Sequence, residues 1–170
     1  MDSKHPHMRI STSAIAFLTA VTVVFPTAAW ADEVGRDDLV ARLGAAAPTG
    51  ANVGIGQVEA SESAGNFGPN RLVAEFVGKI FTDMSGASGN SGHATFVGQN
   101  AYGSTTSIAP GVNRIWVYEA GSFAQGANLS FGNAATLPLV APSSLRIFNH
   151  SWIGSFGNVI IDNEVLRRAD

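Results

Sequence analysis

The sequence predicts an α/β fold in which a parallel sheet lies between helices. Short apolar runs that suit buried strands alternate along the chain with segments of helical periodicity, which is the order typical of a parallel sheet. The chain has 170 residues, of which 45% are hydrophobic, enough for the core of one domain. It contains no cysteine, so disulfide bonds and thiolate chemistry are excluded.

The beginning of the chain has the pattern of a secretory signal peptide. Basic residues precede an apolar stretch at residues 14–25, and Ala29-Trp30-Ala31 then supplies a cleavage site with small residues. The apolar stretch is shorter than the roughly 20 residues that a membrane-spanning helix needs. We therefore expect residues 1–31 to be removed on export, which leaves a secreted or periplasmic protein without a membrane anchor.

Residues 32–50 form a short N-terminal extension before the first predicted strand. Residues 37–47 of this extension are predicted to form a helix. They carry apolar residues at helical spacing and begin with two acidic residues, which the helix dipole favours at the start of a helix. Residues 51–58 are a short apolar run between turn residues, which is typical of a buried strand. Residues 72–77 have the same character and are the second predicted strand.

The second half of the chain continues this alternation. Residues 83–92 are rich in glycine and serine and predict a polar loop, which the predicted helix at residues 94–102 follows. The remaining predicted elements are a strand at 114–118, a weak helix diluted by glycine at 122–135, a strand at 145–148 and a helix at 160–169.

Four segments suggest a function. They are an apolar strand that ends in an acid, Gly50–Glu59 (GANVGIGQVE), a histidine segment, Ser91–Gly98 (SGHATFVG), and the stretches Ile108–Val117 (IAPGVNRIWV) and Asn149–Gly154 (NHSWIG). In this order and spacing they resemble the N-terminal part of the catalytic domain of subtilisin-like serine proteases, the subtilase family. The resemblance implies the three-layer subtilisin fold over residues 51–170, truncated before its C-terminal half.

The resemblance implies a catalytic role for two residues. His93 falls on the catalytic histidine of the family motif His-Gly-Thr-His-Val-Ala-Gly, in which Thr95 is retained while Ala94 and Phe96 replace a glycine and the second histidine. Glu59 falls on the acid of the catalytic triad, which the family usually supplies as an aspartate followed by Thr-Gly.

The resemblance also implies a substrate cleft. Residues 149–154 are similar to the Asn-x-Ser-x-Gly segment that forms one wall of that cleft, so a polypeptide substrate is implied to bind along it. The implied substrate-binding residues are Ser151, Trp152, Ile153 and Gly154. His150 takes the place of an apolar residue of the family and is interpreted as structural.

A histidine and a carboxylate suit the implied chemistry. A serine hydroxyl needs a general base, and an imidazole can act as one because its pKa lies near neutral pH. The carboxylate orients the imidazole and stabilises its charged form. Glu59 is one methylene longer than aspartate, Glu62 is a second candidate for the acid, and in a third alternative neither carboxylate pairs with the histidine. If Glu59 and His93 form the pair, we expect them within about 8 Å of each other at one edge of the sheet, with Thr95 and Val97 packed inward.

The nucleophile is missing from the recognisable segments. The family places its serine in a Gly-Thr-Ser-Met-Ala segment well after the cleft strand, and no serine of this chain lies in such a segment. We therefore expect an N-terminal fragment of a secreted serine endopeptidase, without peptidase activity of its own. The alternative is a catalytically inactive subtilase-like protein that acts in binding or at a surface, so the sequence leaves open whether the protein is an enzyme.

Composition limits the partners and cofactors. The formal net charge is −3, which gives no electrostatic basis for binding nucleic acid or an anionic membrane. Gly54-Ile55-Gly56 suggests a nucleotide-binding loop, but the third glycine that would open a helix is missing. We expect no cofactor, no metal and a monomer.

Overall fold

A computed structural model describes residues 34–126, 128–129, 144–154, 157 and 159–169. The predicted signal peptide and residues 127 and 130–135 of the weak predicted helix lie outside these residues.

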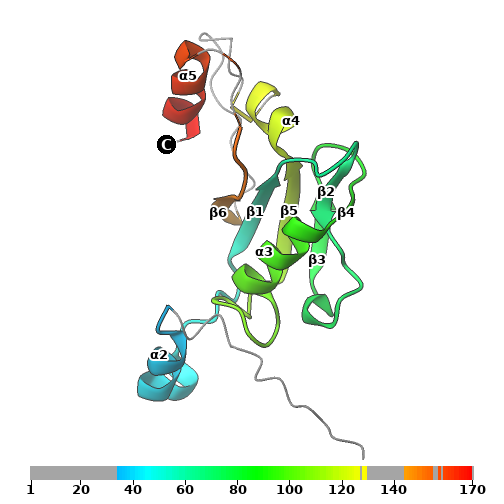
Figure 1. The fold of residues 1–170 in the computed structure, drawn as a ribbon. Helices are drawn as coiled ribbons and strands as arrows, with labels where there is room; N and C mark the ends of the chain where they lie inside the picture. Colours follow the sequence, from blue (N-terminus) through cyan, green and yellow to red (C-terminus); the bar gives the residue numbers. More distant parts are fainter. Residues whose placement is uncertain (1–33, 127, 130–143, 155–156, 158, 170) are drawn as a thin grey trace, which may run out of the picture.

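Four parallel strands form the central sheet, in the order β3-β5-β1-β6 (Figure 1). Strand β1 lies inside the sheet and pairs with β5 on one side and with β6 on the other. Two short strands, β2 and β4, form a second parallel sheet. The predicted α/β class with a mostly parallel sheet is therefore confirmed. The strands are β1 (Gly54–Glu59), β2 (Asn66–Pro69), β3 (Ile80–Asp83), β4 (Gly89–Ser91), β5 (Arg114–Glu119) and β6 (Leu145–His150).

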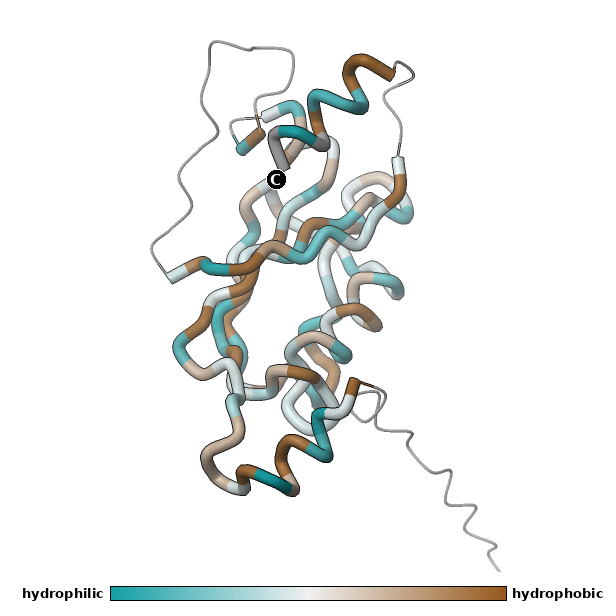
Figure 2. The backbone as a smooth tube through the Cα atoms, turned by 90° about the vertical axis from the view of Figure 1, so that its left-hand side faces the viewer, coloured by the Kyte–Doolittle hydropathy of each residue, from teal (hydrophilic) through white to brown (hydrophobic). Residues whose placement is uncertain are grey.

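Helices lie around this sheet. Helix α3 (Gly92–Tyr102) runs along one face, whereas α4 (Ala120–Gln125) and α5 (Val159–Ala169) lie near the carboxyl ends of the strands (Figure 1). Helix α2 (Arg36–Leu43) lies at the opposite end; it has no buried residue, and hydrophobic and hydrophilic residues follow one another along it (Figure 2). In the part of the chain that the structure describes, no helix is long and apolar enough to cross a membrane.

Hydrophobic residues form two clusters, one on each face of the sheet. Successive side chains of a strand point to opposite faces, so Ile55 of β1 joins one cluster and Val58 joins the other. The cluster on the α3 face consists of Ile55, Phe67, Phe76, Tyr102, Val112, Ile115 and Val117. The cluster on the α4 face consists of Val58, Tyr118, Ala120, Phe123, Ala124, Leu129 and Val165.

Two glycines of β1 serve aromatic packing rather than nucleotide binding. A Cβ atom at Gly56 would lie 2.5 Å from the ring of Phe148, and one at Gly54 would lie 2.4 Å from the ring of Trp116. Both distances are shorter than van der Waals contact, so these rings lie directly on the backbone of β1 because no side chain intervenes. The Gly54-Ile55-Gly56 pattern therefore belongs to a strand and not to a phosphate-binding loop.

The predicted strand at residues 72–77 is wrong. These residues contain a 3₁₀ helix, η2 (Ala74–Phe76), in which Phe76 is buried while Leu72 and Val77 are exposed. The side chain of Asn70 accepts a hydrogen bond from the backbone N–H of Leu72 at 3.1 Å, which starts a turn in place of a strand. The apolar run is thus part of a loop that is held to the core by the buried ring of Phe76.

The predicted polar loop at residues 83–92 is correct only in part. Residues Gly89–Ser91 of this stretch form β4, which pairs with β2, while its first residue, Asp83, ends β3 and its last, Gly92, begins α3. The other predicted helices and strands have counterparts. A second 3₁₀ helix, η1 (Gly44–Ala46), extends α2, and α4 begins two residues before the predicted helix and ends at Gln125.

Candidate active site

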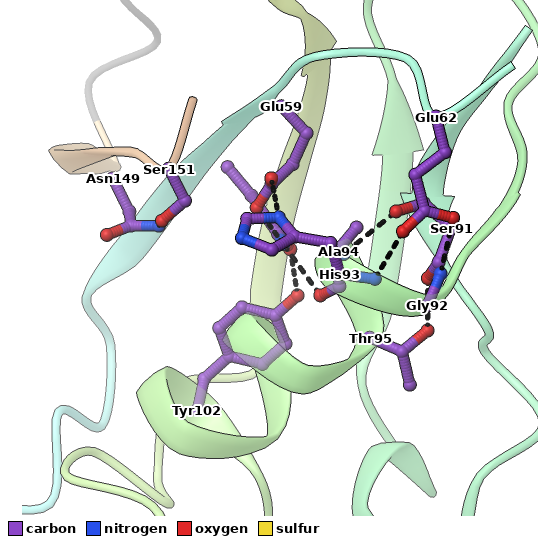
Figure 3. Close-up of polar contacts among 11 residues, drawn as sticks. Glu59, Glu62, Ser91, Gly92, His93, Ala94, Thr95, Tyr102, Asn149 and Ser151 are labelled. Carbon is purple, nitrogen blue, oxygen red and sulfur yellow. Dashed lines mark hydrogen bonds and ion pairs between the residues drawn. The ribbon is translucent and has the colours of Figure 1, made fainter. Parts of the chain in front are cut away.

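The sheet and α3 bring Glu59 and His93 together at the carboxyl end of β1. Glu59 is the last residue of β1 and its side chain is 0% exposed, whereas His93 lies in the first turn of α3 with its side chain 54% exposed. The distance from Glu59 Oε2 to His93 Nδ1 is 2.9 Å (Figure 3). The predicted proximity of these two side chains is confirmed.

When Glu59 is ionised, its contact with His93 assigns the proton of the neutral imidazole to Nδ1. An ionised carboxylate can only accept a hydrogen bond, so Nδ1 of His93 must be the donor toward Glu59. In the neutral ring, Nε2 then has a free lone pair and can accept a proton from another group. Chemically, an imidazole held in this way can act as a general base.

The electrostatic environment of Glu59 combines two opposing effects. Burial raises its pKa above the ordinary value of 4.5, and hydrogen bonds from Gln57 and His93 lower it again in part. The nearby charge of Glu62 raises it further. A carboxylate in this position is a stronger base than one in water, which favours a tight hydrogen bond to the imidazole.

The backbone of α3 is capped where it presents His93. The carboxylate of Glu62 accepts hydrogen bonds from the N–H groups of Gly92 at 3.0 Å and His93 at 2.7 Å. The hydroxyl of Ser91 accepts a third from the N–H of Ala94 at 2.9 Å. The bonds from the N–H groups of His93 and Gly92 hold the pKa of Glu62 below 4.5. Glu62, the second candidate for the acid, therefore orients the helix that carries His93 rather than its ring.

Sequence reasoning missed two residues behind Glu59. Gln57 donates to Glu59 Oε1 and to the carbonyl oxygen of Ala94, both at 2.8 Å, and the hydroxyl of Tyr102 is hydrogen-bonded to Gln57 Oε1. The available signal was a glutamine within an apolar strand, two residues before the acid and therefore on the same face.

An open cleft of about 530 Å³ lies in front of the exposed face of His93. Of the predicted substrate-binding residues, Ser151, Trp152 and Ile153 line this cleft; Gly154 is exposed directly after them but is not among the lining residues. The residues that line the cleft are Ala60, Ser61, Glu62, His93, His150, Ser151, Trp152 and Ile153.

The wall of this cleft begins at the end of β6. Asn149 donates a hydrogen bond to the hydroxyl of Ser151 at 2.7 Å, and Trp152 Nε1 donates to His150 Nδ1 at 3.2 Å. The ring of His150 packs against Phe123, with ring centres 5.1 Å apart, and burial lowers the pKa of His150 below 6.5. His150 thus contacts an aromatic ring on one side and lines the cleft.

The inward packing expected for the first turns of α3 is found in part. Thr95 is half-buried; its hydroxyl donates to the carbonyl oxygen of Ser91 and accepts from the N–H of Asn70. Val97 is only half-buried, whereas Ala94 and Gly98 are the buried residues of that stretch. Within the described residues, no group of three or more histidine, aspartate or glutamate side chains could hold a metal ion.

No protein-family model, curated protein or solved structure matches this chain. The class of the protein therefore rests on its own fold and site, which are a parallel α/β sheet and a carboxylate–imidazole pair at the mouth of a cleft.

Proposed function

We propose that this chain is the N-terminal part of the catalytic domain of a secreted subtilisin-like serine endopeptidase. In this proposal His93 is the general base and Glu59 is the acid that orients it. Residues 151–154 form one wall of the cleft that binds a polypeptide, and the nucleophilic serine comes from a segment that this sequence does not contain.

One observation carries the proposal, namely the 2.9 Å contact between a fully buried carboxylate and the Nδ1 atom of a half-exposed imidazole. Burying a carboxylate costs free energy unless a partner compensates. A surface histidine needs no such partner for stability, so the arrangement suits catalysis better than structure. Acid first and histidine second is also the chain order in which the family presents its triad.

The segments around the pair support the family and also depart from it. Glu59 reaches His93 although it is one methylene longer than the usual aspartate. In the cleft wall, two residues separate Ser151 from Gly154, one more than in the family pattern. Trp152 and Ile153 both line the cleft, so this longer wall presents a large apolar surface to a substrate.

A peptidase assay tests the proposal in two stages. The purified chain alone should neither hydrolyse a fluorogenic peptide nor react with a fluorophosphonate probe, because none of its serines lies in the nucleophile segment of the family. The gene downstream of the codon for Asp170 should then encode a Gly-Thr-Ser-x-Ala segment, and the longer protein should hydrolyse the peptide. His93→Ala should lower kcat of the longer protein by about 10⁴-fold or more, as loss of a triad member does.

Tyr118→Phe is a suitable control for the longer protein, because Tyr118 is buried among the aromatic rings on the α4 face. Probe labelling of a serine in the chain alone would contradict the proposed source of the nucleophile. Hydrolysis that survives His93→Ala would contradict the proposed base.

The alternative is a catalytically inactive subtilase-like binding protein. The departures at Glu59 and in the cleft wall favour it to some degree, and it would retain the same cleft. The absence of a downstream serine segment, together with binding of unstructured peptides that Trp152→Ala weakens, would support this alternative and contradict the peptidase.

The proposal includes export. If Ala29-Trp30-Ala31 is the cleavage site, secreted material should begin at Asp32. N-terminal sequencing of secreted protein tests this, and material that begins at Met1 would contradict it.

A further inference from the structure

A buried chain of hydrogen bonds lies behind the acid of the candidate site. It runs from the hydroxyl of Tyr102 to the carboxamide of Gln57, and from there to Oε1 of Glu59. All three residues are 0% exposed. Oε2, the other oxygen of Glu59, faces His93. Each carboxylate oxygen thus has its own partner.

The chemistry of the partners allows only one orientation of the Gln57 side chain. Its Nε2 atom lies 2.8 Å from Glu59 Oε1 and 2.8 Å from the carbonyl oxygen of Ala94, and both of these atoms are acceptors when the acid is ionised. The amide nitrogen must therefore face them with its two hydrogens. Oε1 of Gln57 then faces Tyr102, whose hydroxyl must be the donor.

Gln57 also joins the two elements that carry the pair. It lies two residues before Glu59 in β1, so both side chains point to the α3 face of the sheet. Its second hydrogen bond reaches Ala94, which directly follows His93 in α3. One amide group therefore links the strand that carries the acid to the helix that carries the base.

Gly98 of α3 leaves the space that the hydroxyl of Tyr102 occupies. A Cβ atom at Gly98 would lie 2.5 Å from the hydroxyl oxygen of Tyr102, so any larger residue would displace that hydroxyl. The ring itself packs against Phe76, with ring centres 5.4 Å apart. Ring packing and hydroxyl bonding can thus be separated by replacing Tyr102 with Phe.

We propose that Gln57 and Tyr102 are positioning residues that hold the carboxylate of Glu59 toward His93. This inference deepens the proposed function and rests on it for its catalytic meaning. The amide occupies one oxygen of the longer glutamate side chain and leaves the other for the imidazole. Tyr102 prevents the amide from turning over.

Nuclear magnetic resonance of the purified chain tests this without any peptidase activity. The variants are Gln57→Leu, which removes both donors, and Tyr102→Phe, which removes one hydroxyl and keeps the ring. Tyr118→Phe is the matched control, because it removes a hydroxyl from another buried tyrosine on the opposite face. The readouts are the ¹³C titration of the Glu59 carboxyl group and the ¹⁵N shifts of the His93 ring, assigned with His93→Gln.

Loss of the Gln57 donor should move the titration midpoint of Glu59 upward by about one pH unit, because a hydrogen bond to the ionised form is removed. Tyr102→Phe should move it in the same direction by less, and Tyr118→Phe should not move it. The fraction of His93 with its proton on Nδ1 should fall in the first two variants. Glu62 and His93 also face this carboxyl group, so the titrations of all three are followed together.

Titration curves and ring shifts that match the wild type in folded Gln57→Leu and Tyr102→Phe would overturn the positioning role. If Gln57→Leu fails to fold, Tyr102→Phe decides the question. A wild-type His93 ring that carries its proton on Nε2 would count against the proposed function instead, so the two failures can be distinguished.

Discussion

Replacing Ser91 with alanine tests how firmly α3 is held where it presents His93. Ser91 is 1% exposed, and its hydroxyl accepts a hydrogen bond from the N–H of Ala94 at 2.9 Å. Ala94 is itself 0% exposed, so water cannot replace the lost acceptor without a change in the first turn. The variant therefore leaves a buried donor unpaired.

The expected cost follows from this geometry. Loss of a serine N-cap typically lowers the free energy of unfolding by about 1 kcal/mol, and by up to about 2 kcal/mol in some proteins. The burial of Ala94 places this site toward the upper end of that range. The domain over residues 51–170 is larger than 100 residues, so each kcal/mol should lower Tm by about 4 °C.

Urea unfolding of the wild type and Ser91→Ala measures this loss, and hydrogen exchange of the Ala94 amide locates it. Exchange at Ala94 should become faster in the variant, and the His93 ring should lose part of its contact with Glu59. Ser107→Ala is the control, because Ser107 is also 0% exposed but its hydroxyl donates to Gly103 beyond the other end of α3. Unchanged stability together with unchanged exchange at Ala94 would refute this reasoning.

Two further predictions concern stability. Phe123 is 3% exposed and packs against the rings of Tyr118 and Phe148. Phe123→Ala should therefore lower the free energy of unfolding, measured by urea titration, by about 3–5 kcal/mol. A loss below about 1 kcal/mol would mean that the α4 face is not packed as described. Hydrogen bonds from Thr105 lower the pKa of Glu75 below 4.5, so its ionised form stabilises the fold above that pH, and this contribution is lost as the pH falls through the lowered folded value. As the pH falls below 4.5, the free energy of unfolding of Glu75→Gln should therefore decrease less than that of the wild type. Parallel curves of unfolding free energy against pH would contradict the stabilising role of the ionised Glu75.

Strands that lie in a mostly apolar run could be predicted from the sequence, and strands without such a run could not. β1 and β5 contain buried apolar residues and were predicted nearly to their ends. β2 (NFGP) and β4 (GNS) contain glycine, proline or polar residues, and their strand conformation comes from pairing with each other. β3 alternates between exposed and half-buried residues, which gives little hydrophobic signal.

The candidate site divides in a similar way. Glu59 and His93 could be predicted because each lies in a short segment with a recognisable pattern. The partnership of Gln57 with Tyr102 could not, because the two residues are far apart in the sequence and a buried glutamine is identified only once its partners are in place. Glu62 was considered for the acid because of its charge, but its distance from the imidazole and its contact with the helix backbone depend on the turn between β1 and β2.

The pairing of β1 also has a consequence for the order in which the molecule assembles. Both partners of this strand lie far along the chain, since Gly54 pairs with Arg114 and with Leu145. Closing such long loops costs entropy before any contact compensates for it, so the pairing of β1 is slow, whereas a local element such as α3 can form early. Glu59 lies in β1 and His93 in α3, and both elements precede β6 in the chain, so the acid and the base can come together before β6 completes the wall of the cleft.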